Sequence, residues 1–163
     1  MHQTVRVDFH LHSDRSDGYC SPAMLAERLA AAGVSHAALT DHNTLDGQQA
    51  FREAFAEAGG VAITGLEVFV HLEGQEAHLL AYGFALEHPA IRPLLGAPLP
   101  AEDAIAAIHR AEGLAFLAHP LNTWKNPEDL ERAVRRLKRM GLDGLEAVYQ
   151  AYSPDEQRRL VDL

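Results

Sequence analysis

The sequence predicts an α/β protein in which a parallel sheet is covered by helices. Short apolar segments alternate with longer amphipathic ones along the 163 residues, a pattern typical of strands connected by helices. Histidines and carboxylates also follow several of the predicted strands. Because the carboxyl ends of parallel strands gather on one face, where sites are built, these observations favour a barrel or a doubly wound sheet.

The first half of the chain contains two strand–helix pairs. We expect strands at Val5–Phe9 and Ala37–Thr40 and helices at Pro22–Ala32 and Leu45–Ala58. Ser21 is the expected cap of the first helix, with Pro22 at its first position, because a serine oxygen can accept from the free N–H groups there. Gly33 is expected to end that helix.

The second half begins with two β-rich segments, Val61–Val70 and Ala77–Phe84, which are predicted to pair as a hairpin around a turn at Glu73–Gly74. Ala85–Leu99 contains three prolines and is expected to be a loop or a short irregular helix. The remaining predicted elements are helices at Pro100–Glu112, Pro127–Met140 and Pro154–Leu163 and strands at Leu114–Ala118 and Gly144–Val148. A closed α/β architecture would need one more strand after them.

Composition restricts the possible functions. The formal net charge of −9 argues against a sequence-independent grip on duplex nucleic acid, which needs a basic face. It leaves phosphate substrates possible if carboxylates bind divalent ions. No segment approaches the ~20 apolar residues that cross a bilayer, and the N-terminus lacks a signal-peptide pattern. With the single cysteine Cys20 no disulfide framework can form, so we expect a cytoplasmic protein.

Four short blocks carry the residues of chemical interest. They are Asp8-Phe9-His10-Leu11-His12 running on to Asp17, Asp41-His42, Glu67 with His78 on the next strand, and His119-Pro120. His10 and His12 are two apart, so on an extended strand both point to the same side. Imidazoles combined with carboxylates and without thiolates suit zinc, manganese or iron. Because all four blocks coincide with predicted strand ends, together they favour a metal cluster.

Each block also has a structural explanation. A His-x-His pair on a strand is often structural, Asp41 could cap the next helix, and His119-Pro120 could simply end a strand. Glu67 is harder to explain in this way, because a lone buried carboxylate is costly. Structural or solvent roles are expected for the five other histidines, His2, His36, His71, His88 and His109.

In this order and spacing the motifs resemble the polymerase and histidinol phosphatase (PHP) family of metallo-phosphoesterases. The matching residues are Asp8-Phe9-His10-Leu11-His12-Ser13, Ser16-Asp17-Gly18, Leu39-Thr40-Asp41-His42-Asn43, Gly65-Leu66-Glu67, His78 and Ala118-His119-Pro120. The chain is most similar to small members that act as nucleotide and nucleoside-3′,5′-bisphosphate phosphatases. The resemblance implies one PHP domain over residues 1–163, a distorted (β/α)7 barrel without its last strand–helix unit.

The resemblance also implies two or three divalent ions, Zn, Mn or Fe. His10, His12 and Glu67 resemble the ligands of the first ion, Asp17 and His42 those of the second, and Glu67, His78 and His119 those of the third. Asp17, His42 and Glu67 would act in catalysis through the ions. The family takes its last two ligands from a late Asp-x-His motif, and no residue after His119 matches it. We therefore expect the first two sites to lack one ligand each and the second to be weakest.

The predicted function is metal-dependent hydrolysis of a phosphate monoester on a small molecule, with a nucleotide or nucleoside bisphosphate as the expected class. Arg15, Asn122 and Lys125 lie in the loops after His12 and His119, where they could hold phosphate or simply be solvated. Two alternatives remain, a 3′–5′ exonuclease and a metal-binding module without catalysis. Membranes and duplex DNA are not expected partners. Unpaired edge strands predict self-association through the open side of the sheet.

Overall fold

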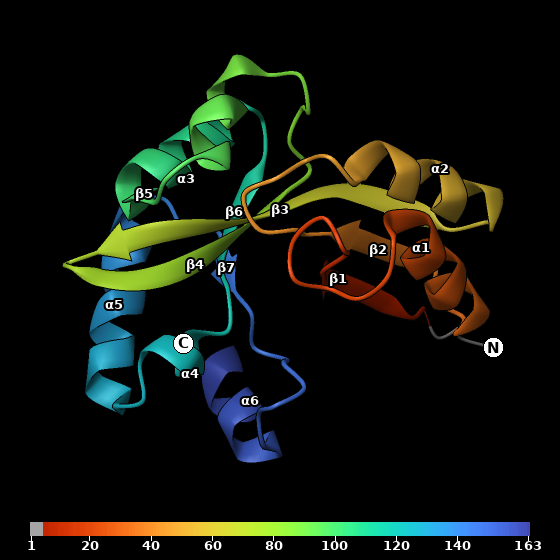
Figure 1. The fold of residues 1–163 in the computed structure, drawn as a ribbon. Helices are drawn as coiled ribbons and strands as arrows, with labels where there is room; N and C mark the ends of the chain where they lie inside the picture. The colour runs from red at the N-terminus through yellow and green to blue at the C-terminus, as the bar shows by residue number, and fades with distance from the viewer. Residues whose placement is uncertain (1–4) are drawn as a thin grey trace.

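This computed structural model describes residues 5–163 of the chain. They fold around a curled, half-barrel sheet of seven strands (Figure 1). The spatial order is β1 (Val7–Leu11), β2 (His36–Leu39), β3 (Val61–Leu72), β4 (Gln75–Tyr82), β6 (Leu114–Leu117) and β7 (Gly144–Leu145). The short strand β5 (Leu99–Pro100) pairs with β3 outside this order. β1 and β7 are thus the two ends of the curled sheet.

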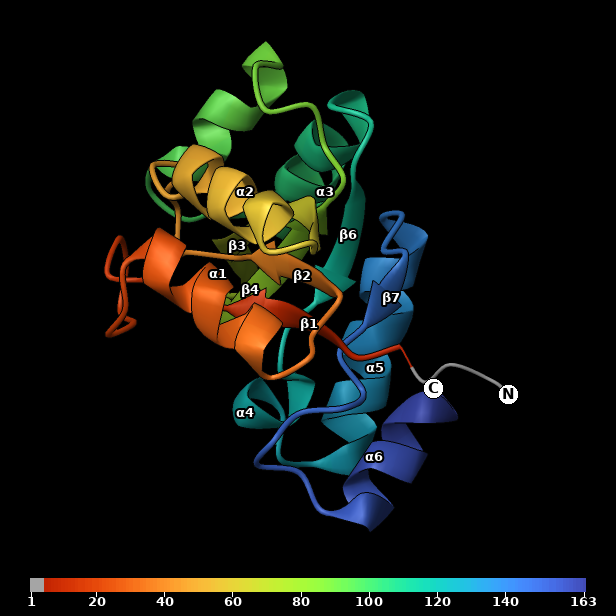
Figure 2. The same ribbon diagram turned by 90° about the vertical axis from the view of Figure 1, so that its right-hand side faces the viewer.

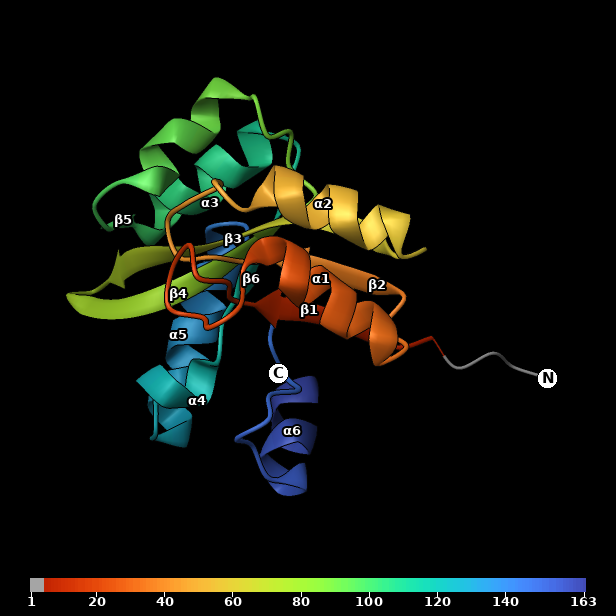
Figure 3. The same ribbon diagram turned by 45° about the vertical axis from the view of Figure 1, so that its right-hand side comes forward.

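The sheet is mixed rather than purely parallel. β1, β2 and β3 are parallel, β4 is antiparallel to both β3 and β6, and β6 is parallel to β7. The predicted hairpin is confirmed, with Leu72 opposite Gln75 across the turn. Both turn residues have positive φ, 52° for Glu73 and 80° for Gly74, as the tightest hairpin turns require. Figure 3 shows this hairpin extending beyond the helices that flank it.

The helices lie mainly on the outer side of the sheet. They are α1 (Pro22–Ala31), α2 (Gln48–Glu57), the 3₁₀ helix η1 (Pro89–Leu95), α3 (Ala101–Arg110), α4 (Pro120–Thr123), α5 (Pro127–Arg139) and α6 (Pro154–Val161). Figure 2 shows α1, α2, α3 and α5 arranged around the strands. Two apolar clusters result, a small one around Phe51 and Phe55 and a larger one beneath α3 and α5. None of the described helices has the length and apolar character needed to cross a membrane.

Local capping explains where most helices begin. The side chain of Ser21 accepts from the backbone N–H of Met24, and α1 starts at Pro22 as predicted. α2 starts at Gln48, three residues after the predicted Leu45. The Gln48 amide is buried and donates to the carbonyl oxygens of Leu39 and Gly65, at 2.8 and 2.9 Å. These bonds tie the first turn of α2 to the end of β2 and to the interior of β3.

Several predicted boundaries differ from the structure. The strand expected at Gly144–Val148 is only the pair Gly144–Leu145, and the last helix ends at Val161 rather than Leu163. The short elements β5 and α4 were not predicted, because two or four residues are too few to show a periodic pattern. The three-proline segment contains η1, in agreement with the predicted short irregular helix.

The long strand β3 determines where the candidate residues meet. Its first half pairs with β2 up to Leu39 and Thr64, and its second half pairs with β4 from Gly65 onward. Glu67 therefore lies in the middle of β3, and the prediction that it follows a strand end is wrong. Glu67 nevertheless lies beside His42, a residue just past the end of β2. A single parallel bridge between the two residues continues the pairing of β2 with β3.

The pairing of β1 with β2 is irregular, and the Thr40 side chain forms hydrogen bonds beside the irregular residues. The register between β1 and β2 shifts between Asp8 and Leu11. The Thr40 hydroxyl accepts from the Leu11 N–H at 3.0 Å and donates to the Leu11 carbonyl at 3.1 Å. The Leu11 carbonyl also accepts from the Thr40 N–H at 2.8 Å, so the hydroxyl mainly supplies the acceptor for the Leu11 N–H. Leu11, between His10 and His12, is thereby held against the end of β2.

Candidate metal centre

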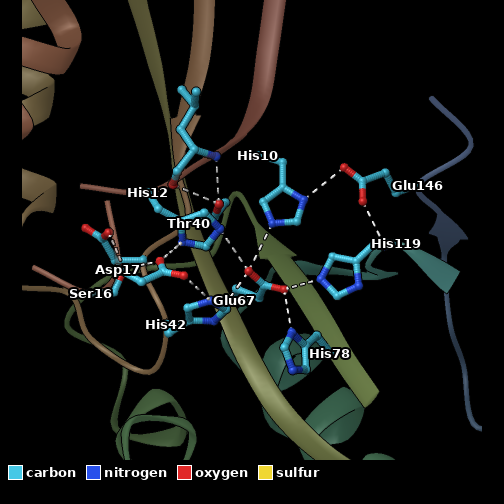
Figure 4. Close-up of polar contacts among 12 residues, drawn as sticks. His10, His12, Ser16, Asp17, Thr40, His42, Glu67, His78, His119 and Glu146 are labelled. Atoms are coloured by element: carbon cyan, nitrogen blue, oxygen red, sulfur yellow. Dashed lines mark hydrogen bonds and ion pairs between the residues drawn. The ribbon is translucent and has the colours of Figure 1, made fainter. Parts of the chain in front are cut away.

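Glu67 is the central residue of the candidate site. Its side chain is fully buried, and Figure 4 shows histidines from four separate parts of the fold pointing at it. Five imidazole nitrogens lie within 3.4 Å of its two oxygens: His10 Nε2 at 2.9 Å, His12 Nε2 at 3.1 Å and His42 Nδ1 at 3.4 Å from Oε2, and His78 Nδ1 at 2.8 Å and His119 Nε2 at 2.9 Å from Oε1.

Topology brings these side chains together. His10 and His12 come from β1 and the residue after it, His42 follows β2, and His78 lies on β4. β4 runs against its neighbours, so its amino-terminal half, with His78, lies beside the carboxyl half of β3. His119 follows β6 as the N-cap of α4. The convergence predicted from strand ends is therefore present in the structure.

Asp17 extends the cluster toward solvent. Its side chain is 66% exposed, with Oδ1 3.4 Å from His12 Nδ1 and Oδ2 3.6 Å from His42 Nε2. The ligand atoms form three groups within which all atoms lie within 4.8 Å of one another: His10, His12 and Glu67; His12, Asp17 and His42; and His42, Glu67 and His78. Two ligands of one zinc ion lie about 4 Å apart or less, so small shifts would bring each group onto a cation.

The donor set fits metal ions better than hydrogen bonds alone. A carboxylate offers about four lone-pair positions, fewer than the five imidazoles around Glu67. Nδ1 of His12, His42 and His119 is buried and makes no hydrogen bond within residues 5–163, although carboxylate oxygens lie 3.4 Å from the first two. Leaving a buried polar nitrogen unpaired costs free energy. Divalent cations would use these lone pairs and balance the charge of the buried carboxylate.

The electrostatics of the cluster favour an ionised Glu67. Burial would raise the pKa of Glu67, but hydrogen bonds from four surrounding imidazoles outweigh it and hold that pKa well below its usual range. Burial would likewise lower the pKa of His10, but hydrogen bonds to Glu146 and Glu67 raise it to about 10. For His42 burial prevails and lowers the pKa. Glu67 is therefore a fixed negative charge at the centre, and in the metal-free protein His10 is the group that mainly balances it.

Asp41 supports the loop that carries Asp17. It is buried, and its carboxylate accepts from the Ser13 N–H and hydroxyl, both at 2.6 Å, and from the Ser16 hydroxyl at 2.7 Å. Asp41 does not cap α2, whose N-cap is Gly47 without a side-chain bond. The same loop requires Gly18, because a Cβ atom there would lie 2.1 Å from the His12 carbonyl oxygen.

Glu146 is the residue that sequence reasoning missed. Its Oε1 lies 2.9 Å from His10 Nδ1, and its Oε2 accepts from the His119 backbone N–H at 2.7 Å. The predicted strand ran through Val148 and placed Glu146 inside it. Because β7 ends at Leu145, Glu146 is in fact the first residue past a strand end. Placement at a predicted strand end is how the other candidates were identified. With the correct boundary of β7, the same criterion would have identified Glu146.

The three residues predicted to bind phosphate lie in different surroundings. A cleft of about 750 Å³ opens beside His78 and His119 and is lined by Asn122. Arg15 is exposed and lies 3.5 Å from Asp14, and Lys125 is also exposed. Among the described residues, the lining of this cleft includes neither cation. Asn122 is thus the candidate that the structure places next to the histidine cluster.

The remaining histidines lie outside the cluster, as far as the chain is described. His109 pairs with Asp143 at 2.8 Å, and Nδ1 of His88 accepts from the Ala90 N–H at the start of η1. His36 contacts the hydroxyl of Ser35, and His71 is exposed on β3. His2 falls outside the described residues.

The role of Asp41 can be tested directly. Asp41→Ala removes the acceptor of three buried or half-buried hydrogen bonds, and leaving such donors unpaired costs about 1–3 kcal/mol. We expect a lower free energy of unfolding in denaturant titrations and faster amide exchange at Ser13. Asp14→Ala changes an exposed carboxylate of the same loop and serves as the control. Equal exchange at Ser13 in both variants would contradict the assigned role.

Comparison with known proteins gives a consistent result. The family model described as PHP domain matches residues 8–130. A 5′-3′ exoribonuclease of Haemophilus influenzae is 39% identical over 92 residues, which cover 56% of this chain and 34% of the relative. A 3′,5′-nucleoside bisphosphate phosphatase of Chromobacterium violaceum is 29% identical over 133 residues, 78% of this chain and 47% of the relative. The matches thus span between a third and a half of these curated relatives.

A solved structure shows the same fold. An amidohydrolase from Chromobacterium violaceum, determined with bound sulfate and no metal, superposes with a TM-score of 0.89 at 20% identity. The alignment covers 95% of this chain and 81% of that protein. At this identity the likeness concerns the fold alone.

Proposed function

The chain belongs to the PHP domain family, and on that premise we propose that it is a metal-dependent phosphoesterase that hydrolyses phosphate monoesters of a small molecule. The observation that carries this proposal is the fully buried Glu67 with five imidazole nitrogens around its carboxylate. We also propose that residues 1–163 belong to a single PHP domain and that the curled sheet is most of a distorted (β/α)7 barrel.

The proposed centre holds two or three Zn, Mn or Fe ions. His10, His12 and Glu67 would hold one ion, Asp17 and His42 a second, and Glu67, His78 and His119 a third. Two of these sets are supported by the close groups of ligand atoms around Glu67 and Asp17. For the third, His78 and His119 both contact Oε1 of Glu67, at 2.8 and 2.9 Å. Glu67 would thus be a ligand shared by two of the proposed ions.

The protein's own contribution to catalysis is placement and charge. When bound, the ions supply a hydroxide at neutral pH and balance charge on the phosphoryl oxygens. Glu67 holds a fixed negative charge and keeps the imidazoles gathered around it, so that only small shifts would be needed when ions bind. Asp41 fixes the loop of Asp17 through Ser13 and Ser16. The amide of Asn122, in the cleft beside His119, can donate to a phosphate oxygen.

A nucleotide or nucleoside bisphosphate is the proposed substrate class. One relative is named a 3′,5′-nucleoside bisphosphate phosphatase, whereas another is named a 5′-3′ exoribonuclease. The second name supports the exonuclease alternative, although its direction is opposite to the 3′–5′ direction expected from the sequence. The net charge of −9 is unfavourable for holding a long polyanion. A short, terminally phosphorylated substrate therefore fits better than a long RNA.

Metal content tests the bridging role of Glu67. Glu67→Ala removes a ligand from two proposed ions at once, whereas His42→Ala removes a ligand from one. We expect elemental analysis of the purified variants to show less metal in Glu67→Ala than in His42→Ala. Circular dichroism should establish that both variants are folded. The same metal content in the two folded variants would reject the bridge.

Activity assays test the reaction and its substrate. Removal of metal with a chelator should lower phosphate release by about 100-fold or more, because a bound ion contributes several kcal/mol of transition-state stabilisation. Adding Mn²⁺ or Zn²⁺ should restore it. We expect faster release from a nucleoside 3′,5′-bisphosphate than from a 5′-phosphorylated oligoribonucleotide. Preference for the oligoribonucleotide would favour the exonuclease alternative, and metal binding without hydrolysis of either would favour the non-catalytic module.

Self-association is proposed through the open side of the sheet. β1 and β7 end the strand order, and Val7 on β1 and Val148 after β7 are 51% and 72% exposed. Unpaired edges with apolar side chains promote pairing between chains. Light scattering should show a dimer that Val7→Lys weakens. Val61→Lys is the control, since Val61 is 52% exposed on the interior strand β3. A monomeric wild-type chain would contradict the proposal.

A further inference from the structure

We infer that Glu146 is a positioning residue that holds two metal-binding histidines in place, His10 at the opposite end of the strand order and His119 after the neighbouring strand. The inference rests on the metal centre of the proposed function and adds to it a residue that binds no ion itself. Glu146 would fix the ring of His10 through its side chain and the peptide of His119 through its backbone. Metal affinity would then depend on a carboxylate outside the ligand set.

The geometry of His10 supports this role. Its Nε2 lies 2.9 Å from Glu67 Oε2 and its Nδ1 lies 2.9 Å from Glu146 Oε1, so both ring nitrogens are engaged. A carboxylate that accepts from Nδ1–H leaves the lone pair on Nε2, the nitrogen that faces the centre. Such carboxylate–histidine pairs fix the tautomer and raise the basicity of a metal-binding imidazole.

At His12 and His119 the second ring nitrogen has no comparable partner. Nδ1 of His12 lies 3.4 Å from the exposed carboxylate of Asp17 without a hydrogen bond, and Nδ1 of His119 is buried without a partner in the described part of the chain. His78 uses Nδ1 itself to contact Glu67. The side chain of Glu146 is only 12% exposed, like that of His10. A carboxylate shielded to this degree is held by its partners rather than solvated.

The second oxygen of Glu146 acts on the backbone of His119. This residue has φ 24° and ψ 59°, in the left-handed region that non-glycine residues seldom occupy. Such a conformation persists only when its surroundings hold it. Glu146 Oε2 accepts from the His119 N–H at 2.7 Å. This bond holds the turn between β6 and α4, where the chain directs the His119 ring toward Glu67.

Glu146 also connects the two ends of the sheet. It follows β7, the last strand in the spatial order, whereas His10 lies on β1, the first. Figure 4 shows Glu146 reaching from the β7 side to both His10 and His119. Its Oε1 therefore joins β1 and β7, two strands that share no backbone pairing, and its Oε2 contacts the residue that follows the neighbouring strand β6. One side chain thus links the metal centre to both ends of the strand order.

The chain contains a matched control for this arrangement. Asp143, three residues earlier, accepts from His109 Nε2 and from the Ala115 N–H, both at 2.8 Å. Asp143 thus also joins one imidazole and one backbone N–H, but at a distance from the candidate ligands in the fold. The stability of an Asp143 variant therefore measures what such a pair of hydrogen bonds contributes to the fold in the absence of a metal-binding role.

The experiment compares Glu146→Ala, Glu146→Gln and Asp143→Ala with the wild-type chain. Mn²⁺ and Zn²⁺ affinities are measured by competition with a coloured chelator. Loss of second-sphere partners typically lowers metal affinity 10–100-fold, and we expect about that loss for Glu146→Ala. Glu146→Gln, which keeps an acceptor oxygen without the charge, should be intermediate. Asp143→Ala should keep wild-type affinity, even if it unfolds at a lower temperature.

A spectroscopic measurement separates positioning from general stability. In the Zn²⁺-loaded protein, long-range ¹H–¹⁵N spectra should show a slowly exchanging Nδ1–H of His10 in the wild type and in Asp143→Ala, because Glu146 accepts from it. In Glu146→Ala this proton should exchange rapidly with solvent. Wild-type affinity in Glu146→Ala, or equal losses in Glu146→Ala and Asp143→Ala, would overturn the inference. If the metal-loaded wild type hydrolyses no phosphate ester, the proposed reaction fails while the affinity ratio still tests Glu146. A wild type that binds neither metal would overturn both.

Discussion

A carboxylate that is removed from water has to be matched by positive charge or by donors, and Glu67 imposes this requirement on the whole sheet. Because it lies in the middle of β3 with no exposure, compensation has to come from neighbouring strands and from the loops that follow them. β1, β2 and β6 contribute imidazoles at or just past their carboxyl ends, and β4 contributes one from its middle. The curl of the sheet is what allows all of them to reach a single side chain.

A second set of polar residues supports the first without facing the centre. The Thr40 hydroxyl accepts from a backbone N–H beside the irregularity in β1, and Asp41 holds the Asp17 loop. Glu146 contacts His10 and His119. Thr40 and Asp41 are themselves buried. Buried polar groups are stable only when their hydrogen bonds are complete, so each support has a narrow choice of residue type. The chemistry of the site therefore extends well beyond its candidate ligands.

Much of this arrangement was predictable from the sequence, for identifiable reasons. Long amphipathic helices and apolar strands have clear periodicity, and Ser21 and Glu73–Gly74 mark their boundaries by local chemistry. The histidine blocks were recognisable because their spacing matches strand geometry. Glu67 was misplaced within its strand because β3 changes partners halfway, from β2 to β4, and pairing partners leave no local pattern. Glu146 was missed for a related reason, since the length of β7 is set by its neighbour β6 rather than by its own residues.

The reversed direction of β4 has a consequence for how the site assembles. Glu67 and His78 are separated by 11 positions and joined by a two-residue turn, whereas His119 and His10 are 52 and 57 positions from Glu67. Closing a short loop costs less chain entropy than closing a long one, and hairpins form within about 1–10 μs. The Glu67–His78 contact is thus available to the folding chain before the distant histidines arrive. A cation held early by this hairpin would serve as a template on which the later strands gather.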